Sequence, residues 1–490
     1  MNSWFLLAAI LIPFLGGFGL LVHPARTRRG RDTYVFWLCL ANSLLVGALL
    51  IFRPGPVTLL SFGGQISLTL HLDGLSFVFA AILAILWPIT NLYAFEYMSH
   101  LEGENRFFAF FTMTYGVVLG IAFAANTFTL YLFYELLTLC TLPLVMHELE
   151  GTARYAGKKY LLYSMAGAAL AFLSMVVLYQ FGSLDYRAGG SLDPDLASGR
   201  HTLVLIGFVL GFFGFGVKAA VWPLHGWLPT AGVAPTPVTA LLHAVAVVNA
   251  GVFAILRLIY YSYGADFVRG SWAQNLVMAF TIVTLLFGSL SAWRMPHLKR
   301  RLAYSTVSNL SYILFAASLM STGGLTAALA HMTVHSVLKI TLFFCAGSIL
   351  CQHHHKGYIW QYEGLGRKMP VTCAAFALAS VGLMGVPPLP GFFSKWMIAE
   401  RAALTGNPLA WLGAFALVVS AFLTGLYLIQ VLIVLYFPTR QADLSGVEEV
   451  TEAGWPIRTA LILLCVLAVC MGLFFTDLSR LLSLCAGGLL

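Results

Sequence analysis

Apolar stretches of about twenty residues recur roughly every 35 residues along this chain, and short segments with charges, glycines or prolines separate them. An α-helix of twenty residues is about 30 Å long, which matches the hydrocarbon core of a bilayer. The pattern therefore predicts an all-α polytopic membrane protein with about fourteen transmembrane helices. These spans are expected near residues 4–22, 34–52, 74–98, 107–124, 126–147, 160–181, 202–223, 236–262, 272–293, 302–320, 325–351, 371–400, 408–437 and 457–484.

Composition and charge support the same class. Hydrophobic residues make up 60% of the chain and charged residues 9%, whereas soluble proteins are about a quarter charged. The formal net charge is +8, but the basic residues lie in short alternate loops, which indicates membrane orientation and not nucleic-acid binding. Because basic loops stay cytoplasmic, the chain is expected in the lipid bilayer of the cell inner (plasma) membrane, with both termini on the external face.

One external segment has the pattern of strands. Residues 57–73 alternate apolar and polar positions on both sides of Gly63 and Gly64, which is typical of a β-hairpin. We predict a small external hairpin here, with an irregular loop as the alternative.

Two spans contain prolines where a continuous helix would need amide donors. The seventh span contains Pro223, and the twelfth contains Pro387, Pro388 and Pro390. Each span is predicted to be two half-helices beside a polar cavity, because unpaired backbone groups are not stable against lipid. The breaks lie five spans apart, which predicts two inverted five-helix repeats, spans 4–8 and 9–13.

This organisation divides the chain into four parts. Residues 1–98 form the N-terminal helices 1–3 with the hairpin near 57–73. Residues 107–262 are the first repeat and residues 272–437 the second, and residues 457–484 form the C-terminal helix 14.

Ionisable side chains occur inside the apolar spans, where a charge costs about 2.5 to 3.5 kcal/mol on insertion scales. Glu135 and Lys218 are interpreted as a pair, since a carboxylate near a buried lysine controls whether the lysine keeps its proton. The spacing i, i+4, i+8 places His331, His335 and Lys339 on one helical face, as in a proton relay. The candidate proton-translocation residues are Glu135, Lys218, His243, His331, His335, Lys339 and Lys395.

Structural explanations compete with some of these assignments. His331 and His335 could be packed core histidines bonded to carbonyls. Lys395 could extend to the membrane interface, and Lys299, Arg300 and Arg301 are interpreted as topology anchors.

The sequence contains no motif for a metal, nucleotide-cofactor or redox site. The eight cysteines are scattered, with no Cys-x-x-Cys pair, and no Gly-rich nucleotide loop follows a strand. The adjacent His353, His354 and His355 are interpreted as a surface tract. We therefore expect no cofactor, no metal and no redox or hydrolytic site on this chain, although it could be a subunit of an ion-translocating oxidoreductase.

Several long motifs resemble one known family. They are FYELLTLCTLPLV around Glu135, the segment from Gly216 to Arg257, LKRRLAYSTVSNLSYI from Leu298, HMTVHSVLKITLFFCAGSI from His331, and GVPPLPGFFSKW from Gly385. Together they closely resemble the antiporter-like membrane subunits that complex I and membrane-bound hydrogenases share with multi-subunit monovalent cation/proton antiporters. Within that family, the motifs are most similar to the D-type antiporter chain.

The resemblance implies a fourteen-helix fold with a central polar axis that carries protons through half-channels. It implies that Glu135 couples to a neighbouring subunit or repeat, that Lys218 is its partner, that His243 is a relay, and that Lys395 ends the second half-channel. One departure is Asn249, which stands where many members have lysine and which cannot titrate. Transport is still expected, through His243.

The sequence leaves the overall function open between three hypotheses. The first is a proton-translocating subunit of a hetero-oligomeric cation/proton antiporter, with Na⁺ as the candidate exchanged ion. The second is a proton-pumping subunit of a redox complex, either a complex I-like NADH-quinone oxidoreductase or a membrane-bound hydrogenase. The third is a non-conducting scaffold. All three require other membrane subunits as partners.

Overall fold

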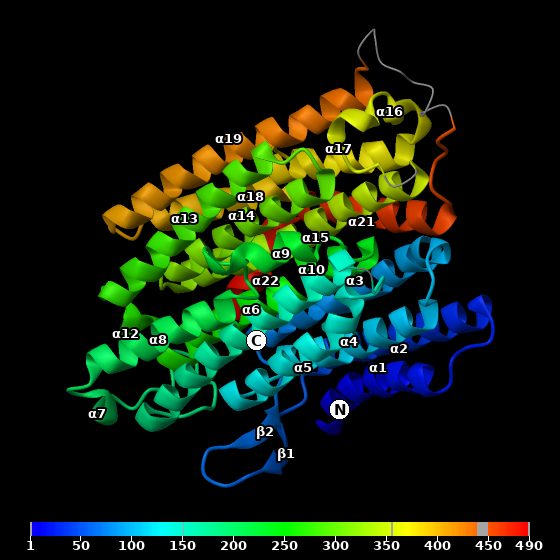
Figure 1. Cartoon of the computed structure of the whole chain (residues 1–490). Helices are drawn as coiled ribbons and strands as arrows, with labels where there is room; N and C mark the ends of the chain where they lie inside the picture. Colours follow the sequence, from blue (N-terminus) through cyan, green and yellow to red (C-terminus); the bar gives the residue numbers. More distant parts are fainter. Residues whose placement is uncertain (1, 150, 354–355, 439–448, 489–490) are drawn as a thin grey trace.

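The computed structural model describes residues 2–149, 151–353, 356–438 and 449–488. Helices run side by side across the molecule, and a two-stranded hairpin projects from one end of the bundle (Figure 1). The first half contains α1 (Trp4–Val22), α2 (Arg28–Phe52), α3 (Gly74–Tyr97), α4 (Glu104–Ala122), α5 (Thr127–Val145), α6 (Gly151–Phe181), α8 (His201–Gly216), α9 (Trp227–Ala231), α10 (Thr236–Ala244) and α11 (Val247–Arg257). The second contains α13 (Trp272–Arg294), α14 (Leu298–Ser318), α15 (Thr322–Gln352), α17 (Pro370–Met384), α18 (Pro390–Ala403), α19 (Pro408–Tyr436), α21 (Trp455–Leu473) and α22 (Phe475–Ala486).

The helical membrane architecture is confirmed. In the described part of the chain, eleven helices are long and apolar enough to cross a membrane, and α8 and α17 are shorter apolar helices. The count of fourteen spans stays a prediction. Helix starts follow local capping, because side-chain oxygens accept the free backbone N–H groups of the first turn. Asn126 caps α5 through the Thr129 N–H at 2.8 Å, and Ser321 caps α15 through the Gly324 N–H at 3.0 Å.

The predicted β-hairpin is also confirmed. Strand β1 (Val57–Ser61) pairs antiparallel with β2 (Ser67–Leu70), with Val57 opposite Leu70 and Ser61 opposite Ser67. Gly63 and Gly64 have φ values of 94° and 59°, which side chains other than glycine disfavour. Gln65, just after the turn, donates to the Gly182 carbonyl at 3.2 Å and accepts from the Leu184 N–H at 3.2 Å, which fixes the hairpin to the loop after α6.

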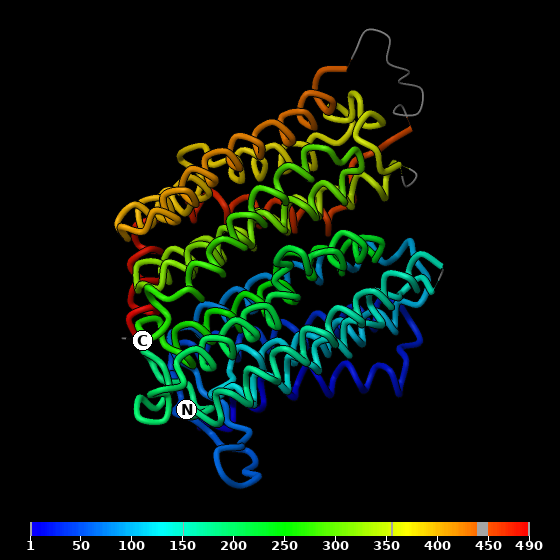
Figure 2. Tube along the Cα trace, turned by 60° about the vertical axis from the view of Figure 1, so that its left-hand side comes forward, coloured from blue at the N-terminus to red at the C-terminus, as the bar shows by residue number. Residues whose placement is uncertain are grey.

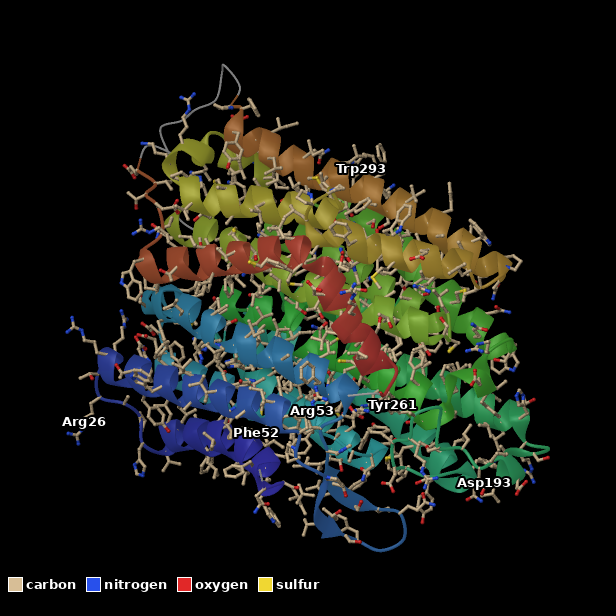
Figure 3. All side chains as sticks on the ribbon, turned by 180° about the vertical axis from the view of Figure 1, so that it is seen from behind. Arg26, Phe52, Arg53, Asp193, Tyr261 and Trp293 are labelled. Atoms are coloured by element: carbon tan, nitrogen blue, oxygen red, sulfur yellow. The ribbon has the colours of Figure 1, made fainter. Side chains whose placement is uncertain are left out.

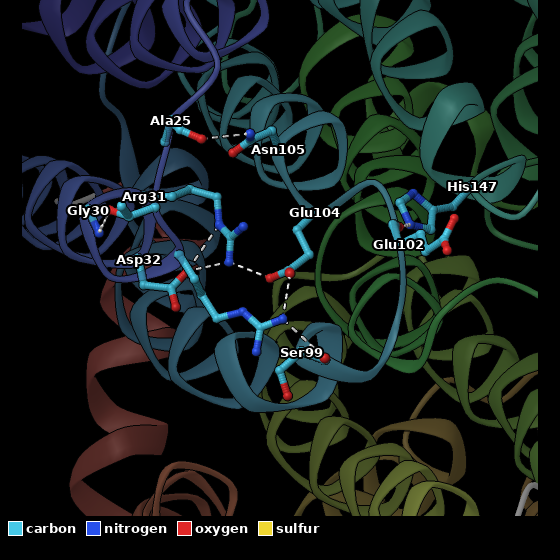
Figure 4. Close-up of polar contacts among 11 residues, drawn as sticks. Ala25, Gly30, Arg31, Asp32, Ser99, Glu102, Glu104, Asn105 and His147 are labelled. Atoms are coloured by element: carbon cyan, nitrogen blue, oxygen red, sulfur yellow. Dashed lines mark hydrogen bonds and ion pairs between the residues drawn. The ribbon is translucent and has the colours of Figure 1, made fainter.

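The loops separate into two groups at opposite ends of the bundle. Arg26 lies at one end and Asp193 at the other (Figure 3). Both chain termini lie at the hairpin end (Figure 2), where Gly74 packs against Cys485. At the opposite end, Glu104 accepts hydrogen bonds from Arg28 and Arg31 and thereby joins the start of α2 to the start of α4 (Figure 4). This grouping matches the predicted alternation of loops.

Both breaks predicted from proline are present. Helix α8 ends at Gly216, and the chain passes through irregular backbone and a short turn (η2, Leu224–Gly226) before α9 begins at Trp227. Helix α17 ends at Met384, where Gly385 has a φ of 93°, and α18 begins at Pro390.

Two further interruptions were not predicted. The segment expected as one span over 236–262 is interrupted at Val245 and Ala246, between α10 and α11, and it ends in a π-helix over Leu258–Tyr263. The C-terminal helix expected over 457–484 bends at Phe474 into α21 and α22. No proline marks either interruption, so packing against other helices must produce them.

Candidate functional site

Helix α15 carries the predicted relay. The helix is continuous over Thr322–Gln352, so His331, His335 and Lys339 lie one turn apart on one face, and each is at most 1% exposed. Lys339 Nζ donates to the Leu302 carbonyl of α14 at 3.2 Å. These three side chains therefore lie in the protein interior and not at the lipid surface.

His243 and Asn249 lie on the two sides of the α10–α11 interruption. His243 ends α10, and its ring packs 4.9 Å from the ring of Phe343 on α15. The Asn249 amide donates to the Ala244 carbonyl at 2.9 Å and to Ser336 Oγ at 2.8 Å. Asn249 thus satisfies a carbonyl at the interruption and links α11 to α15 beside His335, in the place where many family members carry lysine.

Lys395 lies at the second proline break. It is buried, and its Nζ donates to the Leu383 carbonyl at 2.6 Å and to the Met384 carbonyl at 3.3 Å, at the end of α17. Lys395 therefore does not extend to the membrane interface, because these two carbonyls bind its ammonium group inside the protein. Its neighbour Ser394 contacts His331 Nδ1 at 3.0 Å and so joins α18 to the relay helix.

Lys218 and Glu135 form a separate arrangement near the first break. Lys218 is 1% exposed, donates to the Tyr134 carbonyl, and lies 3.5 Å from the centre of the Tyr134 ring. Among the described residues, no ion pair joins Lys218 to Glu135, although the two are close enough to interact electrostatically. Glu135 is only partly buried and shares its helix face with the exposed Leu132 and Leu139. Glu135 and Lys218 therefore form no direct ion pair, and Glu135 lies at a partly exposed position of α5 with its Oε1 buried.

The site residues fall into two groups. His243, His335, Lys339, His331 and Lys395 lie close enough to interact electrostatically. Among the described residues, no side-chain hydrogen bond joins any two of them, and both ring nitrogens of His243 and of His335 have no hydrogen-bond partner. Glu135 and Lys218 form the second group, so the structure gathers His243 with residues of α15 and α18 and leaves the first pair apart.

Lys299 and Arg301, which the sequence suggested as topology anchors, have buried side chains in the structure. Both are buried, because α14 is covered by other elements from its first turn onward. Lys299 Nζ donates to the Ala234 carbonyl at 3.1 Å and lies in electrostatic contact with His243. Lys299 also lines a cavity of about 380 Å³ with Glu148 and His297, at the end opposite the hairpin. Only Arg300 is exposed. The Lys299 signal was present in the LKRRLAYS motif but looked like an ordinary basic loop.

The pair of Asp73 and Arg257 was missed altogether. Asp73 caps α3 and accepts two hydrogen bonds from the buried Arg257 at the end of α11, one of them at 2.7 Å from Nη2 to Oδ1. Arg257 also lies 4.6 Å from the ring of Tyr261 and 4.8 Å from that of Tyr186. The two residues are 184 positions apart, so no local pattern could relate them.

Nothing in the described residues suggests a metal centre. No group of three or more His, Cys, Asp or Glu side chains there could hold a metal ion, and all eight cysteines are free. His353 is buried and contacts the Gln361 carbonyl, whereas His354 and His355 lie outside the described residues.

Comparison with known proteins identifies the class. The family described as "NADH:quinone oxidoreductase/Mrp antiporter, TM" matches residues 124–424, and "NADH-Ubiquinone oxidoreductase (complex I), chain 5 N-terminus" matches residues 60–108. The chain belongs to the NADH:quinone oxidoreductase/Mrp antiporter family of membrane subunits. The resemblance seen in the sequence motifs is thereby confirmed.

Similar curated proteins include subunits of quinone oxidoreductases. NADH-quinone oxidoreductase subunit L of Mycobacterium tuberculosis is 32% identical over 377 residues, which cover 76% of this chain and 58% of the relative. NAD(P)H-quinone oxidoreductase chain 5 of Synechocystis sp. is 30% identical over 403 residues, which cover 78% of this chain and 56% of the relative. The chain therefore spans less than two thirds of the length of these relatives.

Two solved structures share the fold. The Mrp complex from Dietzia sp. contains a chain with a TM-score of 0.85 and 21% identity, covering 99% of this chain and 97% of the other. An archaeal respiratory complex, the membrane-bound sulfane sulfur reductase, contains one with a TM-score of 0.84 and 23% identity, with the same coverage. The first is an antiporter complex by name and the second a redox complex, so fold likeness does not separate the two.

Proposed function

We propose that this chain is a proton-translocating membrane subunit of a hetero-oligomeric complex, and that it works as an antiporter subunit exchanging protons for a monovalent cation such as Na⁺. One observation carries the proposal. His243, His335, Lys339, His331 and Lys395 are buried titratable groups gathered where interrupted helices pack on α15, and Ser394 joins His331 to α18 beside Lys395. Ionisable groups in a membrane interior are expensive, and proton relays are the function that most often requires them.

The arrangement of acceptors suits repeated protonation and deprotonation. Lys339 and Lys395 donate to backbone carbonyls rather than to carboxylates. A lysine amine can donate to a carbonyl whether the amine is charged or neutral. Because neither lysine is paired with a carboxylate, loss of the lysine proton does not leave a buried anion without its cation. Histidine accepts at one ring nitrogen and donates from the other, which lets His243, His331 and His335 pass a proton between the lysines.

The cavity lined by Lys299 and Glu148 is proposed as the mouth of this pathway at the end opposite the hairpin, which the basic loops assign to the cytoplasm. From there a proton reaches Lys299, then His243, and then the residues of α15. Ser394 connects His331 to the break that holds Lys395. We propose that the hairpin end, near Lys395, is the external exit.

Glu135 and Lys218 are proposed as the coupling element of the first half. Glu135 lies at a partly exposed position of α5, and its Oε1 is buried with no hydrogen-bond partner in the described chain. A carboxylate in that position can contact a neighbouring subunit and change the charge balance at Lys218. The division into inverted repeats at 107–262 and 272–437 is part of this proposal.

A redox-driven pump is the second candidate, and the identity to NADH-quinone oxidoreductase subunits favours it. The decisive test uses the complete complex, purified with its partners and reconstituted in vesicles that contain a pH-sensitive dye. Under our proposal, an imposed Na⁺ gradient changes the internal pH without any electron donor. A pH change that appears only when an electron donor and acceptor are supplied would instead assign the chain to a redox complex.

The same vesicles test the pathway itself. Lys339→Ala and Lys395→Ala are each expected to abolish most of the pH change, whichever energy source drives it, because each removes one of the buried titratable groups. Ser348→Ala is the matched control, since Ser348 lies on α15, is buried, and is not a titratable group; its hydroxyl donates to the Phe344 carbonyl of the same helix. Normal transport by both lysine variants would contradict the proposed pathway.

A further inference from the structure

A second cavity, of about 510 Å³, opens at the hairpin end of the bundle. It lies between the start of α13, the start of α15 and the end of α18, at the opposite end of the bundle from the candidate pathway mouth. Two arginines, Arg269 and Arg401, line it, and its described lining includes no acidic residue. The cavity is therefore strongly cationic, and nothing proposed above uses it.

Arg401 has no partner for its charge. In the described part of the chain it makes no hydrogen bond and no ion pair, and its Nε is buried without an acceptor. The buried Nε has lost water without gaining an acceptor, which is unfavourable. The side chain nevertheless stays in the cavity instead of extending into solvent.

The position of Arg401 makes the missing partner more significant. Its side chain lies directly on Gly323, the second residue of α15. A Cβ added at Gly323 would lie 2.8 Å from Arg401 Cδ and 3.2 Å from Nε. The N-terminus of a helix carries a partial positive charge and free N–H groups, and α15 is 31 residues long. Arg401 thus lies against the positive end of a long helix, so the guanidinium and the helix both add positive potential to the cavity.

Arg269 adds a second positive charge. It donates to the Met320 carbonyl at 2.9 Å, one residue before Ser321, the N-cap of α15. Its only acidic partner, in the described residues, is Asp266, which is 82% exposed and therefore screened by solvent. Asp266 neutralises little of the charge inside the cavity.

We propose that this cavity binds a phosphate group, supplied by the head group of an anionic phospholipid. Arginine forks and helix N-termini are both suited to phosphate oxygens, and here they converge. The cavity lies at the ends of membrane-spanning helices, where lipid phosphates are found. The bound head group would join α15 to α18, the two helices that carry His331 and Lys395. The proposal does not depend on what the complex transports.

The test is the thermal stability of the delipidated complex in detergent, measured with no lipid, with phosphatidylglycerol, with phosphatidylcholine, or with inorganic phosphate. Without lipid, Arg401→Gln should melt at or above the wild-type temperature, because it removes an unpaired cation. Phosphatidylglycerol should stabilise the wild type, and Arg401→Gln should need roughly tenfold more lipid for half the effect, since it loses charged hydrogen bonds. Arg294→Gln, on an exposed arginine at the other end of α13, should behave as wild type in every arm.

The effect of Arg401→Gln on the melting temperature should change from neutral or stabilising without lipid to destabilising with phosphatidylglycerol. This change separates a binding site from a purely structural role. If Arg401→Gln lowers the melting temperature equally with and without phosphatidylglycerol, the proposal is overturned. If inorganic phosphate alone gives stabilisation that depends on Arg401, the phosphate site is supported and its source is a soluble anion. Arg401→Lys keeps the positive charge but loses the paired N–H donors of the guanidinium. If the Arg401→Gln complex does not assemble, Arg401→Lys tests whether the guanidinium binds the phosphate. An Arg401→Lys complex with unchanged lipid dependence would contradict recognition by the guanidinium fork.

Discussion

Buried cations in this protein are bound mainly by backbone carbonyls. Lys218, Lys299, Arg301, Lys339 and Lys395 donate to the carbonyls of Tyr134, Ala234, Tyr427, Leu302 and Leu383, respectively. Carbonyls stay neutral, so they accept from an amine in either protonation state. Arg257 differs, because it pairs with the carboxylate of Asp73. At the residue scale, the four lysines are suited to releasing and binding protons, whereas Arg301 stays charged and the Arg257–Asp73 pair is suited to stability.

His243 is the residue on which proton movement past Asn249 is predicted to depend. Asn249 cannot titrate, and its amide is occupied by Ala244 and Ser336. We therefore expect His243→Ala to slow proton transport by the reconstituted complex by roughly tenfold or more, the scale of loss when a proton-transfer group is removed. Thr239→Val, one turn earlier in α10, is the control. Transport by His243→Ala at the wild-type rate would place the route elsewhere.

The Asp73–Arg257 pair predicts a pH-dependent stability. Burial raises the pKa of the Asp73 carboxyl, but the Arg257 guanidinium and its hydrogen bonds lower this pKa by more. The pKa of Asp73 therefore lies below its ordinary value. The pair therefore stabilises the folded protein above the unfolded pKa of about 3.9, and this stabilisation is lost as the pH falls through the folded pKa.

Asp73→Asn tests this pair, since asparagine can still cap α3 but cannot form the ion pair. We expect a loss of roughly 3 kcal/mol at pH 7, because Arg257 is left buried without its anion. Thermal melting between pH 3 and pH 7 should show the wild type approaching the variant only at the acid end. Asp266→Asn, which removes an exposed ion pair, should change little. Parallel curves for Asp73→Asn and wild type would show that the pair does not control acid stability.

At the element scale, glycines let other helices support the breaks. A Cβ at Gly251 of α11 would lie 2.5 Å from the Ala219 backbone nitrogen, beside Lys218. A Cβ at Gly472 of α21 would lie 2.3 Å from the Pro388 carbonyl oxygen, in the linker before Lys395. Both contacts are too short for any side chain. The two lysine-bearing breaks are thus each seated against the backbone of a neighbouring helix.

Gly472→Ala is predicted to displace the linker between α17 and α18 and to impair transport through Lys395. The added methyl would overlap the Pro388 carbonyl oxygen, and the position of a Cβ on a helix is fixed by the helix backbone. The Pro388 backbone must therefore move. Gly425→Ala in α19 is the matched control, since its Cβ would meet nothing within 4 Å, and it should be neutral or stabilise by up to about 1 kcal/mol. The measurement is the rate of pH change in vesicles, with assembly of the complex checked by size-exclusion chromatography. Equal rates for both variants would exclude a positioning role for Gly472.

At the scale of the whole molecule, loops of predicted opposite sidedness lie at opposite ends of the bundle. The hairpin contacts the loop after α6, and Arg269 before α13 contacts Met320 before α15. At the other end, Glu96 accepts from the Gly454 N–H and caps α21. Alternate loops thus cluster in space, as a helix bundle that crosses one membrane requires.

The orientation of this bundle can be measured directly. A cysteine at Ser198, in the loop after α6, is expected to react with a membrane-impermeant maleimide added outside intact cells. A cysteine at His100, between α3 and α4, is expected to react only after the membrane is opened. Both positions are exposed, so burial does not explain a difference. The reverse labelling pattern would invert the proposed direction of transport.

The sequence by itself determined the membrane class, the hairpin, the proline breaks and the spacing of His331, His335 and Lys339. These features are local, since hydropathy, turn glycines, missing amide donors and helical periodicity act within a few turns of chain. Lys218, His243 and Lys395 were found for a related reason, because an ionisable residue in an apolar stretch is visible without knowing its neighbours.

Only the tertiary structure decided what these residues contact. It showed that Asn249 bridges to Ser336, that Glu135 and Lys218 make no direct ion pair, that Lys299 is buried, and that Asp73 holds Arg257. The interruption between α10 and α11 belongs here too, since its backbone is satisfied partly by a side chain from the next helix segment. The physical reason is shared: the partners lie far apart in sequence, and packing of the complete bundle determines whether each buried polar group has one.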